Sequence, residues 1–316
     1  FRSITGLSPL KYLTMTRLAA SLRLLADPKV GVAEAAHSVG YPDEYYFSRV
    51  FKKQLGITPT EYALRAQVSV AVLCPIFTGD LAVLGISPCV TLGKDWDLDE
   101  GNRERYLREI KQAKPDLILS GPLDEALVRE IRAIAPITVY DWHARPWQRR
   151  LADFSSLLGL ESVAERWLAD YASKTDNARR HVAERWPETP YLIVGARRGN
   201  YRIYGKLRRK FTDLLYDELG FEAPAASAGI GFMDTPSLDD VIALGSENAL
   251  FLIEFEAEEA FCEEIEIRWK DVAGETGAGR RCIFIRLDEP FLYNAAMHER
   301  LVDEIVGYIY SGGKAK

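Results

Sequence analysis

The chain has 316 residues, of which 47% are hydrophobic and 27% charged, and its net charge is −6. This composition supports a packed core and excludes a disordered chain, and no stretch approaches the roughly 20 apolar residues of a membrane-spanning helix. The four cysteines form no CxxC pair, which is typical of a reducing compartment. Because the first residues also lack the apolar region of a signal peptide, we expect a cytoplasmic protein with no membrane partner.

The charge is distributed unevenly along the chain. Residues 1–67 contain nine Lys or Arg and five Asp or Glu, a net charge of +4, which leaves −10 for the other 249 residues. Such asymmetry favours a nucleic-acid-binding module joined to a second domain, although a chance distribution is the alternative. We therefore expect a small basic domain at 1–67 and a larger acidic one at 68–316.

The basic segment contains an imperfect repeat. The stretches FRSITGLSPLKY (1–12) and FKKQLGITPTEY (51–62) share Phe, Gly, Pro and Tyr at the same spacing. A repeat predicts duplicated structural units. The first copy lacks its front half, so we expect a truncated N-terminus, with an incomplete first unit at 1–12, a linking helix at 13–25 and a second unit at 30–65.

The second unit has the pattern of two short helices across a tight turn. Apolar residues share one face of a first helix that ends at Gly40, and Asp43 is placed to cap the next helix. Phe47 and Phe51 form the apolar stripe of this second helix, and its other faces are polar and basic. This arrangement predicts a helix-turn-helix whose second helix enters a major groove about 12 Å wide.

These residues resemble the second helix-turn-helix unit of the AraC-type transcription regulators. The match comprises Ala36, Val39, Gly40, Tyr41, Asp43, Tyr46, Phe47, Ser48, Arg49, Phe51, Lys52, Lys53, Gly56, Thr58, Pro59 and Tyr62. The resemblance implies binding of promoter DNA and an interaction with RNA polymerase. We expect Asp43, Glu44, Tyr45 and Arg49 to face base edges, and Ser48, Lys52 and Lys53 to face phosphates. A solvated helix face is the alternative for each.

From Val68 onward, short apolar strands alternate with helices. This pattern predicts parallel sheets with helices on both faces. It occurs twice, so we expect an α/β fold with lobe one at 68–146, a long bridging helix at 147–186 that is broken near Gly159, and lobe two at 187–316. Two such lobes suit a ligand cleft lined by loops at the carboxyl ends of the strands.

The order of the motifs in this part resembles the helix-hinged, class III periplasmic binding proteins, which deliver siderophores, haem or cobalamin to importers. The resemblance is carried by Lys114-Pro115-Asp116-Leu117-Ile118, Leu158-Gly159-Leu160-Glu161 with Ala164, Trp167 and Leu168, Asp213-Leu214-Leu215 through Gly220-Phe221, Ser237-Leu238 through Leu252, and Tyr293-Asn294. Secreted members begin with a signal sequence, whereas a DNA-binding segment stands in that place here.

A chain that joins an AraC-type part to such a binding-protein part resembles regulators of Gram-positive bacteria that sense ferri-bacillibactin. They imply a DNA-binding activator of siderophore-uptake genes whose effector is a ferric siderophore of the catecholate type. The alternative is a solute-binding component of an iron-siderophore, haem or cobalamin importer.

A ferric tris-catecholate is a trianion with aromatic edges, so its site needs cations and aromatic faces. The segment GARRGNYRIYG supplies Arg197, Arg198, Tyr201 and Lys206, and loops of the first lobe supply Lys94, Trp96, Trp142, His143 and Arg145. Strand alternation turns Arg197 and Arg198 in opposite directions, so we expect only one of them to face the ligand. Solvated charges or packing aromatics are the alternatives.

Other kinds of site are not expected. The four His residues are too dispersed for a directly bound metal. The sequence also lacks a P-loop, a GxSxG elbow and an HExxH motif, so we expect a binding protein rather than an enzyme.

Overall fold

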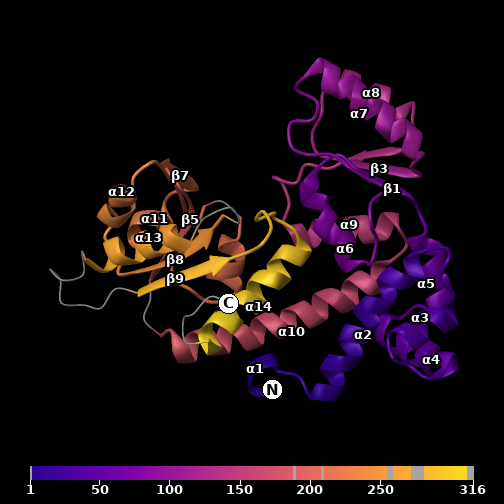
Figure 1. The fold of residues 1–316 in the computed structure, drawn as a ribbon, viewed down its shortest axis with the longest axis horizontal. Coiled ribbons are helices and arrows are strands. Elements are labelled where there is room, and N and C mark those ends of the chain that lie inside the picture. The colour runs from indigo at the N-terminus through magenta and orange to yellow at the C-terminus, as the bar shows by residue number, and fades with distance from the viewer. Residues whose placement is uncertain (1, 188–189, 208–209, 255–258, 272–280, 312–316) are drawn as a thin grey trace. The chain divides into compact units, whose positions relative to one another are not determined.

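The computed structural model (Figure 1) describes residues 2–187, 190–207, 210–254, 259–271 and 281–311. The chain divides into two units, which we describe separately. The N-terminal unit comprises Phe1–Tyr171 with Asn294–Ala296, and the C-terminal unit comprises Ala172–Tyr293 with Met297–Lys316. The helical segment and the first α/β segment therefore belong to one unit.

The N-terminal unit begins with helices whose first residues are capped by side chains. Ser8, Asp43 and Thr58 each accept hydrogen bonds from backbone amides at a helix start, and Ser8 and Thr58 are followed by proline at the first helical position. The cap at Ser8 makes the linking helix begin at Pro9, four residues before the predicted start. The helices are α1 (Arg2–Thr5), α2 (Pro9–Ala26), α3 (Val32–Ser38), α4 (Glu44–Leu55) and α5 (Pro59–Ala66).

The core of these helices is aromatic. Phe51 packs edge-on against Phe47 and Tyr62, with ring centroids 5.5 and 5.9 Å apart, and all three side chains are fully buried. Gly40 closes the turn between α3 and α4 with a φ of +84°, a conformation that glycine adopts at little cost. The helix-turn-helix predicted from the sequence is thus present.

A parallel sheet forms the rest of the N-terminal unit, with strand order β2-β1-β3-β4. Helices α7 and α8 cover one face of this sheet, and α6 and α9 lie on the other (Figure 1). The elements are β1 (Val70–Val72), η1 (Pro75–Phe77), α6 (Thr78–Val83), β2 (Val90–Thr91), α7 (Glu100–Ala113), β3 (Leu117–Ser120), α8 (Glu125–Arg132), β4 (Ile137–Val139) and α9 (Trp147–Leu157).

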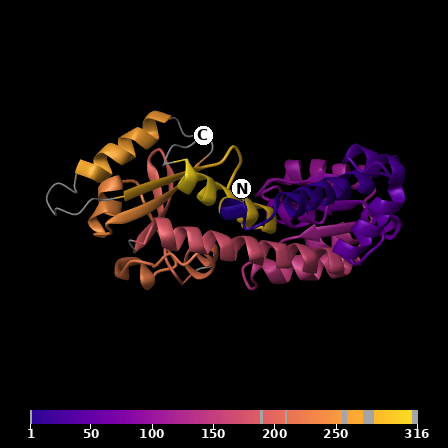
Figure 2. The same cartoon turned by 90° about the horizontal axis from the view of Figure 1, so that it is seen from below.

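The long helical stretch after this sheet is two helices rather than one. Gly159, with a φ of +66°, separates α9 from α10 (Glu161–Arg185). Helix α10 is the long rose helix of Figure 2, and its residues belong to the N-terminal unit up to Tyr171 and to the C-terminal unit from Ala172.

The C-terminal unit contains a mixed sheet with strand order β7-β6-β5-β8-β9. Strands β5, β8 and β9 are parallel, whereas β6 and β7 pair antiparallel. Helices α12 and α13 cover one face of the sheet. The elements are β5 (Tyr191–Arg197), β6 (Asn200–Tyr204), the π-helical η2 (Asp213–Glu218), α11 (Ala225–Ala228), β7 (Phe232–Thr235), α12 (Leu238–Ala243), β8 (Asn248–Ile253), α13 (Glu259–Asp271), β9 (Arg281–Arg286) and α14 (Ala295–Tyr310).

The antiparallel part of this sheet departs from the all-parallel expectation. Only Arg198 and Gly199 separate β5 from β6, and Gly199 has a φ of +76°. A two-residue connection makes a hairpin, because a parallel crossover needs a dozen or more residues.

Candidate functional site

The second helix of the helix-turn-helix, α4, presents a polar and basic surface. Its start is held by Asp43, whose carboxylate oxygens accept hydrogen bonds from the Tyr45 and Tyr46 amides at 3.1 and 2.9 Å. Its apolar stripe is buried at Phe47 and Phe51. Asp43 is thus engaged as a helix cap, in addition to the base contact predicted for it.

The remaining residues predicted to contact DNA lie on the outer side of α4. Tyr45 is 80% exposed, and Arg49, Lys52 and Lys53 are exposed as well. Tyr45, Arg49 and Lys52 stand at i, i+4 and i+7 and so share one face of the helix. Ser48 lies on the same side and is half-buried, as is Glu44.

The cations of α4 form no close ion pair with the described part of the chain. Among the described residues, none of Arg49, Lys52 and Lys53 has a carboxylate oxygen within 4 Å. The guanidinium of Arg49 lies 5.5 Å from the centroid of the Tyr46 ring, which restrains it on the surface. An exposed helix with unpaired cations is suited to a phosphate backbone.

A second candidate site is a cavity of about 310 Å³ within the C-terminal unit. It opens where β5 and β8 end, the edge at which α/β proteins bind ligands. Its lining combines three cations and two aromatic rings with one carboxylate: Gly195, Arg197, Asn200, Arg202, Tyr204, Lys210, Leu252, Glu254, Pro290 and Phe291.

The hairpin register explains which residues of β5 and β6 reach this cavity. Arg202 is the partner of Gly195 across the strands, and Asn200 is the partner of Arg197. Paired residues project from the same face of a sheet, so these side chains converge. Gly195 leaves room for the Tyr204 ring, because a Cβ there would lie 3.2 Å from ring atoms.

The cations of the cavity differ in their partners. Arg202 makes two hydrogen bonds of 2.6 Å to the carboxylate of Asp234, and these bonds hold the pKa of Asp234 below its usual value. Arg197 is exposed and, among the described residues, has no carboxylate oxygen within 4 Å. Arg197 is therefore the cavity arginine whose charge is available to an anion.

Neighbouring candidates of the same segment lie elsewhere. Arg198 points to the opposite face of the sheet, where it lies 3.7 Å from Glu264 and stacks on the Phe261 ring. Tyr201 is on that face too, 7% exposed and packed against Phe261. Lys206 is exposed in the turn after β6 and does not line the cavity. The structure brings only Arg197 of these four to the cavity.

The candidates from the first lobe lie in the N-terminal unit. Lys94 is exposed, whereas Trp96 is 5% exposed and packs in the core beside Tyr106. Trp142 stacks on His143 with centroids 3.6 Å apart. The guanidinium of Arg145 lies 3.4 Å from Asp153. The burial of Trp96 makes it a core residue, which was its alternative interpretation.

Sequence reasoning missed Asn200, Arg202, Tyr204 and Lys210. Asn200, Arg202 and Tyr204 are alternate residues of β6, so they project from one face of the sheet. If the hairpin had been recognised, the alternation that separates Arg197 from Arg198 would have pointed to these three residues rather than to Tyr201. Lys210 lies in the loop before η2, and no signal in the sequence placed it beside the sheet.

In the part of the chain that the structure describes, no helix has the length and apolar character that a membrane crossing requires. Over the same residues, no group of three His, Cys, Asp or Glu side chains is arranged to hold a metal ion.

Comparisons with known proteins bear on both candidate sites. Residues 1–65 match the family model of a helix-turn-helix domain. The structure is similar to a FhuD fold-family periplasmic binding protein component of a ferrichrome transporter from Bacillus subtilis, with a TM-score of 0.61 at 16% identity over 77% of this chain and 94% of that chain. It is also similar to the iron-uptake system-binding protein FeuA of that organism, with a TM-score of 0.58 at 16% identity over 76% and 93%.

These likenesses define the folds that the chain contains. The chain carries an AraC-type helix-turn-helix domain at its N-terminus, and most of the remainder has the fold of the FhuD-type binding proteins, so both resemblances seen in the sequence are confirmed. Over 98% of its length the chain is 27% identical to the HTH-type transcriptional activator Btr of Bacillus subtilis (strain 168). The chain spans 61% of the length of that relative.

Proposed function

We propose that this protein is a ligand-responsive DNA-binding regulator that activates iron-siderophore uptake genes in the cytoplasm. The observation that carries the proposal is that one chain holds a helix-turn-helix with an unpaired cationic surface and a cationic, aromatic cavity. Similarity to a transcriptional activator over nearly the whole chain supports it. The proposal assigns no catalytic step to the protein.

On this proposal, α4 enters the major groove of promoter DNA. Tyr45 and Arg49 are exposed on the face that meets base edges, and Glu44 flanks them. Ser48, Lys52 and Lys53 contact phosphates, which fixes the register of the helix on the duplex. Asp43 contributes chiefly as the cap that sets where α4 begins. RNA polymerase is the partner that an activator requires.

The effector on this proposal is a ferric siderophore of the catecholate type. The structural neighbours include a ferrichrome transporter component, an iron-uptake system-binding protein and a FhuD2 structure with bound ferrioxamine B, and they support a ferric siderophore as the ligand class. The catecholate type is inferred from the cavity. A tris-catecholate trianion is complementary to Arg197 and Lys210 and to the faces of Tyr204 and Phe291. Binding changes DNA affinity only if the complex favours one conformation of the protein over another.

A fluorescence titration tests the ligand class. Ferric tris-catecholate, ferric hydroxamate and haem are added in turn to the protein, whose six tryptophans report binding. We expect saturable quenching by the catecholate complex and weaker binding of the hydroxamate, which lacks its negative charge. Binding of haem alone would contradict the catecholate assignment.

A selection from random DNA duplexes tests the regulator. We expect enrichment of a defined site and a change of affinity for it when ferric tris-catecholate is added. The similarity to periplasmic binding proteins favours a second candidate, the solute-binding component of an importer. Recovery of the protein outside the cell, with no enriched DNA site, would support that candidate.

A further inference from the structure

Two loops of the C-terminal unit complete the cavity beside the β5–β6 hairpin. One carries Lys210 and Phe211 before η2, and the other carries Pro290 and Phe291 after β9. Neither loop belongs to the sheet, so its position depends on contacts with other elements. Both loops are fastened to α14, whose residues from Met297 onward lie in the same unit.

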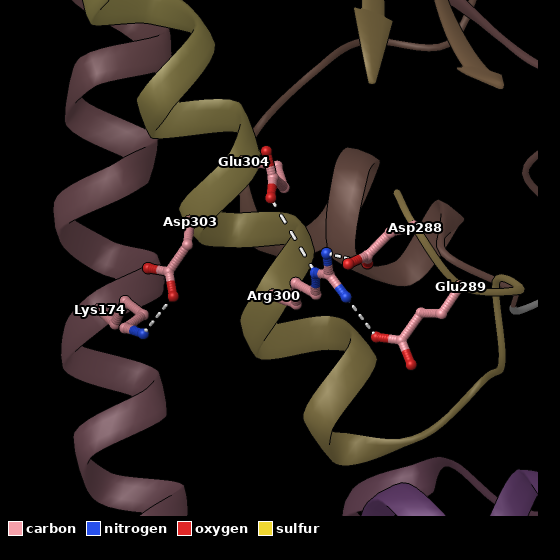
Figure 3. Close-up of polar contacts among 6 residues, drawn as sticks. All are labelled: Lys174, Asp288, Glu289, Arg300, Asp303 and Glu304. Atoms are coloured by element: carbon pink, nitrogen blue, oxygen red, sulfur yellow. Dashed lines mark hydrogen bonds and ion pairs between the residues drawn. The ribbon is translucent and has the colours of Figure 1, made fainter. Parts of the chain in front are cut away.

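An arginine of α14 holds the first part of the loop that follows β9. Arg300 donates hydrogen bonds to Asp288 and to Glu289, the latter at 2.6 Å, and its Nε lies 4.0 Å from Glu304 (Figure 3). The arginine lowers the pKa of the Asp288 carboxyl by hydrogen bonding to it. The two acids immediately precede Pro290, so Arg300 fixes the chain at the point where it enters the cavity wall.

The loop before η2 is held by a buried cluster. Asp213 accepts a hydrogen bond of 2.5 Å from the Tyr293 hydroxyl, and its other oxygen lies 3.5 Å from Nε2 of His298 on α14. The fully buried Phe211 ring packs on His298 and also on Phe291, at centroid distances of 5.7 and 6.0 Å.

The backbone of Phe211 also indicates that contacts with other elements hold this loop. Its φ of +64° lies in the left-handed region, which a bulky residue rarely adopts and which persists only where surrounding contacts enforce it. Here the enforcing contacts come from α14 and from the other loop. The residue immediately before it, Lys210, is thereby directed to the cavity.

Helix α14 is itself anchored within the unit. Lys174 of α10 donates hydrogen bonds to Glu299 at 3.0 Å and to Asp303 at 2.9 Å, and Figure 3 shows Lys174 beside Asp303. The helix is thus clamped to α10 by Glu299 and Asp303, while His298 and Arg300 hold the two loops.

We infer that Arg300 and His298 are positioning residues of the cavity, and that α14 holds Lys210 and Phe291 at the spacing that a bound anion requires. The inference rests on the proposed function of the cavity as the ligand site. It predicts that α14 controls which ligand fits, although neither positioning residue lines the cavity.

Arg300→Met tests this inference, with Arg268→Met as the matched control. Arg268 also binds a carboxylate through two hydrogen bonds, to Asp239, but on the face covered by α13 and away from the cavity. We expect Arg300→Met to weaken binding of ferric tris-catecholate about tenfold with little change in melting temperature, and Arg268→Met to leave binding unchanged. Arg300→Lys should restore binding in part, because one ammonium can reach one of the two acids.

Hydrogen exchange of the ligand-free protein supplies a readout that does not depend on the ligand. We expect peptides covering residues 286–293 to exchange faster in Arg300→Met than in the wild type or in Arg268→Met. Equal exchange in the two variants would overturn the inference. Faster exchange in Arg300→Met combined with no catecholate binding by the wild type would instead reject the proposed ligand and leave the positioning role standing.

Discussion

The hydroxyl of Tyr62, at the centre of α5, donates a hydrogen bond of 2.7 Å to the carbonyl oxygen of Leu84 at the end of α6. Tyr62 is fully buried, and burial raises the pKa of its phenol. Arg65, one turn further along α5, donates to the carbonyl of Gly159. The helix-turn-helix therefore shares a core with the first α/β segment of the N-terminal unit, rather than being attached to it through a free linker.

Gly85 leaves no room for a side chain in this shared core. A Cβ there would lie 2.3 Å from the Tyr62 hydroxyl and 2.6 Å from Cβ of Leu22, and the φ of Gly85 is +82°. We expect Gly85→Ala to lower the free energy of unfolding by roughly 2–4 kcal/mol, from backbone strain and overpacking together. Urea denaturation followed by circular dichroism measures this change.

Gly245→Ala is the control for Gly85→Ala. Gly245 has a φ of +72°, but a Cβ added there would have no atom within 4 Å, so this variant carries the backbone cost alone, about 1 kcal/mol. Equal losses of unfolding free energy in the two variants would show that close packing at Gly85 contributes nothing to the stability of the folded protein.

The cations of α4 should contribute to DNA affinity in two distinct ways. Lys52→Met should weaken binding to all duplexes alike and reduce the slope of log K against log salt by about 1, because one phosphate contact is lost. Arg49→Ala should cost about 1–3 kcal/mol and relax the preference at one base pair. Fluorescence anisotropy with selected and scrambled duplexes at several salt concentrations separates the two effects.

Lys111→Met serves as the control for these variants, since Lys111 is an exposed lysine on α7 of the same unit. If the slope of log K against log salt were the same for Lys52→Met and Lys111→Met, the prediction that α4 lies in the DNA interface would be wrong.

The opposite orientations of Arg197 and Arg198 make them a natural pair for testing the cavity. Arg197 lines it and has no carboxylate within 4 Å among the described residues, whereas Arg198 lies beside Glu264 on the other face. We expect Arg197→Met to weaken binding of ferric tris-catecholate roughly 10- to 100-fold, the value of a lost charge-assisted contact. Arg198→Met should bind as the wild type does. The reverse order of affinities would place the ligand on the opposite face of the sheet.

The carboxyl of Asp213 should contribute stability that depends on pH. Burial raises its pKa, but His298 and the Tyr293 hydroxyl lower it more, so the pKa lies below its usual value. A lowered pKa stabilises the folded state above the pKa of the unfolded chain, about 3.9, and this stability is lost as the pH falls through the folded value. The stability difference between the wild type and Asp213→Asn should therefore narrow as the pH is lowered from 7 to 3.

Denaturation midpoints measured across this pH range test the prediction for Asp213. Asp176→Asn, at an exposed position of α10, is the matched variant that carries the same substitution on the surface. A stability difference for Asp213→Asn that stays constant down to pH 3 would mean that the charge of Asp213 contributes nothing.

The sequence by itself determined the features that depend on near neighbours in the chain. Caps such as Thr58 followed by Pro59 and the left-handed Gly40 specify helix ends through local hydrogen bonds and backbone freedom, so the helix-turn-helix was predictable. The period of a strand likewise predicted that Arg197 and Arg198 point in opposite directions.

Only the tertiary structure decided which side chains surround the cavity and what the helix-turn-helix packs against. Arg202 and Tyr204 reach the cavity through the register of β6 on β5, and Lys210 and Phe291 reach it because α14 holds their loops. The bond from Tyr62 to Leu84 also joins residues of separate elements. Such contacts depend on packing between segments that local propensity does not encode, which is why the sequence pointed to the chemistry of the site but not to its full set of residues.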